Sequence, residues 1–214
     1  MEKRMVKFYA KDSNKVAIHA VPGHFSTGHS HINYYINITS LKSRVSEARE
    51  LAKLLAAKFT SNITIDTIVC MDGMEVVGAF LAEELEKRDV MTITNLHETV
   101  YVVPPEFNAS NQMIFRDNSI PAIQGKHVLL LLATTTTGVT IRQSLECIRY
   151  YGGTVVGVVS AFSTVKEVEG FTVECAFNEE DVPGYAAYPV EECPFCKKGH
   201  RVEAMVNGFG YSKL

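Results

Sequence analysis

The stretch of this sequence best suited to chemistry is a run of small and hydroxyl-bearing residues, namely Thr134, Thr135, Thr136, Thr137, Gly138, Val139 and Thr140. Such a loop lets backbone N–H groups converge on an anion, and the threonine hydroxyls add further donors. No Gly-Lys-Ser/Thr sequence follows the glycine, so the run is not a Walker A loop. We predict that residues 134–140 bind a phosphate group; the alternative is a threonine-rich turn without a ligand.

The elements on either side of this loop must hold it in place. Residues 128–132 are five consecutive large aliphatics, which is typical of a strand buried on both faces of a parallel sheet. Behind the loop, Ile141, Leu145 and Ile148 repeat at helical spacing. The loop would therefore lie at a helix N-terminus, where the helix dipole supplies roughly half a positive charge.

A second strand, turn and helix occur earlier in the chain. Residues 67–71 form an apolar strand that ends at Asp72 and Gly73, and a helical pattern follows. Both turns would lie at the carboxyl edge of one parallel sheet, where open α/β folds bind ligands. We expect Asp72, Gly73 and Met74 to face the same site as the threonine-rich loop.

The strand at 128–132 and its loop resemble the signature of the type I phosphoribosyltransferases, in which four aliphatics, two acidic residues and two further residues precede Thr-Thr-Gly-x-Thr. Residues 128–131 and 136–140 fill the aliphatic and phosphate-loop places. The resemblance implies an α/β fold with a largely parallel sheet and helices on both faces. It also implies phosphoribosyl pyrophosphate, a nucleotide or phosphate as ligand, together with Mg2+.

The acidic pair of that signature is missing, because Leu132 and Ala133 occupy its places. In the family those carboxylates bind the ribose hydroxyls and help to organise magnesium. The family's pyrophosphate loop corresponds to Asp72, Gly73 and Met74, and Met74 stands where a second glycine is usual. The family's flexible lid carries a lysine that neutralises the leaving pyrophosphate, whereas the only cation here between residues 100 and 125 is Arg116. The sequence thus predicts a degenerate catalytic site.

Residues 1–40 contain short strand patterns around a polar segment. The resemblance implies that they form a hood over the site. Phe25, Thr27, Gly28 and Ser30 resemble the residues with which orotate phosphoribosyltransferases cover the pyrimidine base. His24, His29 and His31 also lie in the segment. Three close histidines could form a metal cluster, but no acidic residue or helical pair accompanies them, so the sequence favours a polar loop that covers the substrate.

The C-terminal segment contains Cys193 and Cys196 in a Cys-x2-Cys arrangement. Two thiolates on one turn are half of a tetrahedral zinc site, for which His200 would be a third ligand and Cys175 a distant fourth. A free thiol pair is the alternative. We expect a phosphoribosyltransferase-like domain at residues 1–190, of which 1–40 is the hood, and a cysteine-containing tail at 191–214 that holds Zn2+ if the site is complete.

Further elements follow from periodicity. Strands are expected at residues 16–18, 34–38, 91–94, 100–103, 112–115, 154–160 and 172–177, and an amphipathic helix at 43–59, with a loop at 106–111.

The composition places limits on the partners. The chain has 214 residues, 46% of them hydrophobic, which is enough for a full core. A formal net charge of -3 provides no general field for nucleic acid, and no apolar run is long enough for a membrane span. We expect a cytoplasmic protein, and the resemblance implies a homodimer.

Two functions remain open from the sequence. The resemblance implies an orotate phosphoribosyltransferase-like enzyme that joins a pyrimidine base to phosphoribosyl pyrophosphate with magnesium. The altered residues favour a non-catalytic relative that binds a nucleotide or a phosphorylated ribose as a sensor or partner protein, because ribose positioning and leaving-group neutralisation each contribute several kcal/mol to such a reaction.

Overall fold

The computed structural model describes residues 2–59, 63–89, 99–110 and 112–214. Its central sheet has the strand order β10-β11-β9-β8-β4-β5. The bounds are Thr67–Cys70 for β4, Tyr101–Val103 for β5, His127–Thr135 for β8, Thr154–Ser163 for β9, Glu167–Val168 for β10 and Phe171–Asn178 for β11. All neighbouring strands are parallel except β10, which pairs antiparallel with β11.

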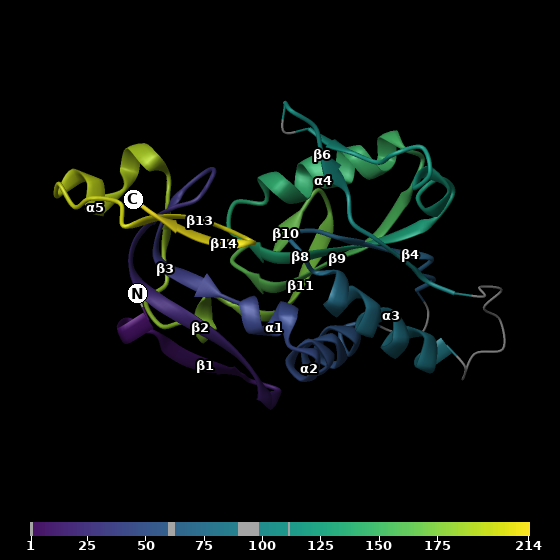
Figure 1. The fold of residues 1–214 in the computed structure, drawn as a ribbon, viewed down its shortest axis with the longest axis horizontal. Coiled ribbons are helices and arrows are strands. Elements are labelled where there is room, and N and C mark those ends of the chain that lie inside the picture. Colours follow the sequence, from purple (N-terminus) through teal and green to yellow (C-terminus); the bar gives the residue numbers. More distant parts are fainter. Residues whose placement is uncertain (1, 60–62, 90–98, 111) are drawn as a thin grey trace.

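Helices cover both faces of this sheet, as Figure 1 shows. The helices α2 (Val45–Ala56) and α3 (Glu75–Asp89) pack on one face, and α4 (Val139–Tyr150) packs on the other. Successive residues of β8 therefore enter two different cores: Leu129 and Leu131 pack towards α2 and α3, whereas Leu130 and Leu132 pack towards α4. The predicted fold class, a largely parallel sheet with helices on both faces, is confirmed.

The second sheet forms the hood and has the order β12-β3-β2-β13-β14, with β1 paired to β2. The bounds are Val6–Ala10 for β1, Ser13–Ser26 for β2, His31–Asn37 for β3, Ala187–Tyr188 for β12, Ala204–Asn207 for β13 and Gly210–Lys213 for β14. β13 pairs in parallel with the end of β2, where Ala204 lies opposite Phe25. The C-terminal residues are thus part of the hood sheet rather than an appended tail.

Smaller elements complete the chain: α1 (Thr39–Ser43), β6 (Glu106–Phe107), β7 (Met113–Ile114), α5 (Pro194–Lys197) and the 3-10 helices Glu2–Arg4, Ile120–Ala122, Glu179–Asp181 and Val190–Glu192. The loop expected at 106–111 instead begins with a strand, since β6 pairs antiparallel with β7. Arg116 donates to Glu106 across this hairpin, at 2.8 Å from Nε to Oε2. The strand expected at 91–94 lies outside the described residues.

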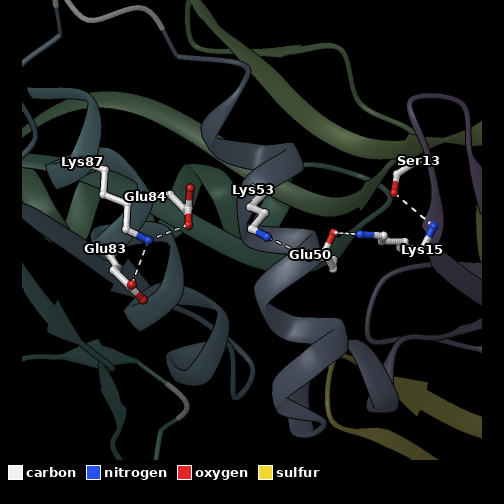
Figure 2. Close-up of polar contacts among 7 residues, drawn as sticks. All are labelled: Ser13, Lys15, Glu50, Lys53, Glu83, Glu84 and Lys87. Atoms are coloured by element: carbon white, nitrogen blue, oxygen red, sulfur yellow. Dashed lines mark hydrogen bonds and ion pairs between the residues drawn. The ribbon is translucent and has the colours of Figure 1, made fainter. Parts of the chain in front are cut away.

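Ion pairs on the outer surface link the hood sheet to the helical layer. Figure 2 shows Lys15 of β2 reaching towards Glu50 of α2, with 3.8 Å between Nζ and Oε2, while Glu50 also accepts from Lys53. On α3, Lys87 contacts both Glu83 and Glu84. Exposed pairs of this kind contribute about 0.2–1 kcal/mol each, so the buried clusters stabilise the layers far more. Within the described residues, no helix combines the length and apolar character that a membrane span requires.

Candidate functional site

A cavity of about 350 Å³ lies where β4 and β8 end, between the central sheet and the hood. Most of its lining comes from four places: the loop at 134–140 with the start of α4, the end of β4 at Met71 and Asp72, the hood segment at 27–36, and the tip of the β13–β14 hairpin at 206–209. Phe107, Phe162 and Tyr185 complete it. Figure 1 shows that hairpin extending from the hood towards the central sheet. The fold therefore brings together the two turns and the hood that the sequence assigned to one site.

The threonine-rich loop lines this cavity, but its first two residues are strand. β8 continues to Thr135, so Thr134 pairs with Phe162 and Thr135 with Ser163 of β9. The loop proper is Thr136, Thr137 and Gly138, and α4 begins at Val139. The N-terminus of α4 has no side-chain cap and no acidic residue in its first turn. Its first N–H groups therefore lack helical acceptors and are free to bind an anion.

Gly138 has a conformational reason to be glycine. Its φ is 72°, in the left-handed region, and an added Cβ would lie 2.9 Å from Val168 Cγ2. Gly125 has a similar φ of 71° with open space around it. We expect Gly138→Ala to destabilise the protein by about 2–3 kcal/mol, since it adds a clash to the roughly 1–2 kcal/mol cost of the left-handed backbone.

Urea unfolding measures this effect, and Gly125→Ala is the matched control because it carries the backbone cost alone. Equal losses for the two variants would mean that the Val168 contact does not constrain the loop.

The two sequence positions that hold the acidic pair in the family signature lie inside the hydrophobic cores of this protein. Leu132 and Ala133 are both fully buried and pack on opposite faces of the sheet. The carboxylate that reaches this region is Asp72, which accepts a hydrogen bond from the Ala133 N–H. Burial raises the pKa of the Asp72 carboxyl, and the ammonium of Lys42 and the Ala133 N–H offset part of that rise.

These residues do not match a protein-held magnesium site. Mg2+ prefers an octahedral set of oxygen ligands, usually one or two carboxylates with phosphates and water. Asp72 is the sole carboxylate among the described residues that line the cavity. It is already engaged by Ala133, and its backbone has a strained φ of 55°. The magnesium implied by the resemblance therefore finds no acidic pair to hold it.

The predicted pyrophosphate loop differs from expectation in two residues. Met74 is fully buried in the core that includes α2 and α3, so it does not face the cavity. Gly73 is covered by the hairpin tip, since a Cβ added there would lie 3.7 Å from Phe209. Lys42 clamps the same place: its Nζ donates to Asp72 O and to Gly208 O, both at 2.6 Å. The turn predicted to bind pyrophosphate is thus covered by Phe209 and Lys42.

The hairpin tip and Lys42 are site residues that the sequence analysis missed. Asn207-Gly208 lies between residues of alternating burial in β13 and exposed residues in β14, which is a usual hairpin signal. That signal was present in the sequence. No such signal marked Lys42, because a lysine next to an amphipathic helix is ordinarily solvated. In the structure Lys42 is buried, and desolvation lowers the pKa of its ammonium group.

The four predicted hood residues have different positions. Thr27 and Gly28 line the cavity, as does the neighbouring His29. Ser30 is buried and shares a hydrogen bond of 2.9 Å with Thr27 Oγ1, which closes the hood turn. Phe25 packs beneath the hood in a separate apolar cluster and is fully buried. The hood turn reaches the cavity, and Phe25 supports it from below.

The cysteines of the C-terminal segment meet two hood histidines rather than the predicted partners. The ligand atoms of His24, His31, Cys193 and Cys196 all lie within 4.8 Å of one another. His200 contributes its backbone carbonyl, which accepts from His24 Nδ1 at 3.1 Å, and its ring is not in this group. Cys175 lies in β11 of the central sheet. Two of the three histidines assigned to a covering loop therefore belong to a metal-type cluster.

The charge of the cavity is low. Among the lining residues that the structure describes, none is lysine or arginine. Arg116, the one cation of the lid region, is paired with Glu106 in the β6–β7 hairpin. The N-terminus of α4 is therefore the principal anion-binding feature of the cavity.

Comparison with known proteins gives the following relatives. No family model matches the chain. The orotate phosphoribosyltransferase of Thermotoga maritima is 28% identical over 137 residues, which are 58% of this chain and 72% of the relative. That of Pelotomaculum thermopropionicum is 26% identical over 180 residues, or 83% of this chain and 85% of the relative. The solved orotate phosphoribosyltransferase of Mycobacterium tuberculosis in complex with Fe(III) dicitrate has a TM-score of 0.52 and 15% identity, over 77% of this chain and 91% of that one.

Parallel sheet, hood and threonine-glycine loop together define the type I phosphoribosyltransferase fold, and this chain has it. Within that class its sequence is similar to the orotate phosphoribosyltransferases. The family resemblance drawn from the loop signature is confirmed.

Proposed function

We propose that this protein binds a nucleoside 5′-monophosphate or a similar phosphorylated ribose and that it transfers phosphoribosyl groups weakly or not at all. The observation that carries the proposal is the uncapped N-terminus of α4, which opens into a cavity lined by one carboxylate and by no described lysine or arginine. One phosphate fits this arrangement through backbone N–H groups. A pyrophosphate would need further positive charge.

The remaining walls suit a ribose and a base. Tyr35, Phe162 and Tyr185 line the cavity beneath the hood, and Tyr185 is the partly exposed aromatic ring among them. The Tyr185 hydroxyl oxygen is buried and has no hydrogen-bond partner among the described residues. An unpaired buried hydroxyl costs about 1–3 kcal/mol, and because this oxygen has almost no accessible surface, a ligand would pair with it only if the Tyr185 ring moved.

Isothermal titration with UMP, orotidine 5′-monophosphate, AMP, GMP, phosphoribosyl pyrophosphate and inorganic phosphate tests the proposal. Thr137 is exposed in the loop, so Thr137→Glu places a negative charge at the helix N-terminus without disturbing the core. We expect Thr137→Glu to weaken monophosphate binding at least tenfold, about 1.4 kcal/mol, through charge repulsion.

The matched control is Thr137→Gln, which has nearly the same size and no charge and should stay within about threefold of the unmodified protein. Absence of binding by every phosphate compound, or equal affinity for the two variants, would contradict the proposal.

The position of Asp72 favours a second candidate, an orotate phosphoribosyltransferase-like enzyme. Its carboxylate lies next to Ala133, the place of one missing acid, and could accept from ribose hydroxyls there. Pyrophosphate release with orotate, uracil and purine bases, with and without magnesium, distinguishes the candidates. Turnover of about 1 per second or faster that is lost in Asp72→Asn would establish the enzyme and end the binding-only proposal.

The homodimer implied by the resemblance stays a prediction, and light scattering of the purified protein tests it.

A further inference from the structure

Four side chains from opposite ends of the chain converge beside the hood turn. His24 lies in β2, His31 begins β3, Cys193 directly precedes α5 and Cys196 lies within it. His24, His31 and Cys193 are buried, with exposed fractions of 3%, 7% and 0%, and Cys196 is at the surface. Every ligand atom lies within 4.8 Å of the other three.

Four of the six separations between these atoms are close to the edges of a metal tetrahedron, and the other two are within 4.8 Å. Zinc bonds of about 2.0–2.1 Å to nitrogen and about 2.3 Å to sulfur give edges of about 3.3 Å between two nitrogens and about 3.5 Å between nitrogen and sulfur. His24 Nε2 lies 3.0 Å from His31 Nδ1 and 3.4 Å from Cys193 Sγ. Cys196 Sγ lies 3.3 Å from His31 Nδ1 and 3.7 Å from His24 Nε2. Small adjustments would therefore admit the ion.

The surroundings of His24 fix the tautomer that a metal ligand needs. His24 Nδ1 lies 3.1 Å from His200 O and 3.2 Å from Arg201 O, and carbonyl oxygens can only accept. The Nδ1–H must therefore donate to them, which leaves the Nε2 lone pair directed at the two thiols. This outer-shell hydrogen bond to a backbone carbonyl is characteristic of histidines that bind metals.

The four ligand atoms converge on one point. His24 Nε2 has three neighbours within 3.7 Å, namely His31 Nδ1, Cys193 Sγ and Cys196 Sγ. Without an ion, the groups can pair as two hydrogen bonds, Cys193 with His24 and Cys196 with His31. A divalent cation bound by two thiolates and two neutral imidazoles would use all four atoms at once and balance the charge.

We propose that His24, His31, Cys193 and Cys196 form a structural Zn2+ site. Two thiolates and two imidazoles in tetrahedral arrangement are the ligand set of closed zinc sites. The ligands bracket the hood turn at residues 27–30 and anchor to it the segment that leads into the β13–β14 hairpin. The ion would thus clip the C-terminal segment onto the hood, independently of which ligand the cavity binds.

Metal analysis and X-ray absorption of the unmodified full-length protein, purified without added zinc, test the site without any need for a variant to fold. We expect about one zinc per chain, with two sulfur ligands near 2.3 Å and two nitrogen ligands near 2.0 Å. The proposal would be overturned if the protein held less than half an equivalent of zinc per chain and dialysis against zinc did not raise this content. A bound zinc without sulfur ligands would also overturn it.

Variants separate this ligand set from the one suggested by the sequence alone. Cys196→Ser, at an exposed position, and His31→Ala should each lower the zinc content at least fivefold after dialysis against a mild chelator. His200→Ala and Cys175→Ser are the matched controls and should keep about one equivalent, because the His200 carbonyl belongs to the backbone. Loss of zinc in either control equal to that in Cys196→Ser would also overturn the assignment.

Discussion

Leu132→Asp is expected to destabilise the fold by about 4 kcal/mol or more rather than to restore phosphoribosyl transfer. Leu132 occupies the place of an acidic residue in the family signature, so the substitution would restore one acidic residue of that signature. In the structure its side chain is fully buried against α4, in the cluster that contains Ile141 and Leu145. An aspartate there would be an unpaired charge in an apolar core, which is among the costliest of single substitutions.

Urea and thermal unfolding measure this loss. For a chain of this length each kcal/mol corresponds to about 2–4 °C, so the midpoint should fall by roughly 8–16 °C. Leu132→Met is the matched control and should cost less than about 1.5 kcal/mol, since it conserves volume and polarity. A stable Leu132→Asp protein that releases pyrophosphate from phosphoribosyl pyrophosphate would show that the strand can turn this residue towards the ribose, and our account of the degenerate site would fail.

The same residue illustrates what the sequence could predict. The aliphatic run at 128–132 predicts a buried parallel strand, because a strand covered on both faces has no polar side, and β8 confirms this prediction. The loop and helix behind it followed from a change of period and from Gly138. These are local signals, which depend on neighbours within a few residues, and the structure agrees with them.

Contacts between distant segments could not be predicted in this way. His24 and Cys193 are 169 residues apart, and neither shows in sequence that it meets the other. Their meeting depends on β13 pairing in parallel with β2 and on β12 pairing with β3, two strand pairings that bring the C-terminal segment to the hood. The sequence therefore indicates two members of the His-Cys cluster and assigns the other two places to His200 and Cys175.

Substitution of Lys42 is the second change for which we expect a large loss of stability. Its ammonium donates to Asp72 O and Gly208 O, and so joins the β4–α3 turn to the hairpin tip. Gly208 must stay without a side chain at this contact, because a Cβ there would lie 2.4 Å from Asp72 Cγ. We expect Lys42→Met to cost about 2–3 kcal/mol, since it leaves two partly buried carbonyls without this donor, each worth roughly 1–3 kcal/mol.

Hydrogen exchange should locate the damage in Lys42→Met. Protection should be lost in β13 and β14 while the amides of β8 keep theirs, because the central sheet does not depend on the clamp. Lys53→Met removes a lysine from an exposed pair with Glu50 and should cost at most about 1 kcal/mol with no local opening. An equal loss in both variants would show that Lys42 stabilises the protein only as an ordinary surface lysine.

The loss caused by Lys42→Met should depend on pH in a direction set by Asp72. Burial raises the pKa of the Asp72 carboxyl, and Lys42 is the first of the groups that offset this rise. Without the ammonium the pKa rises further, so the stability that Asp72 contributes is present below its unfolded pKa and is lost as the pH rises through its folded pKa. The deficit of Lys42→Met should therefore be larger at about pH 7 than at about pH 4, and in the double variant with Asp72→Asn this pH dependence should largely disappear. A deficit that is constant over this range would show that the two charges do not interact, and the cation would then act through its hydrogen bonds to the two carbonyls alone.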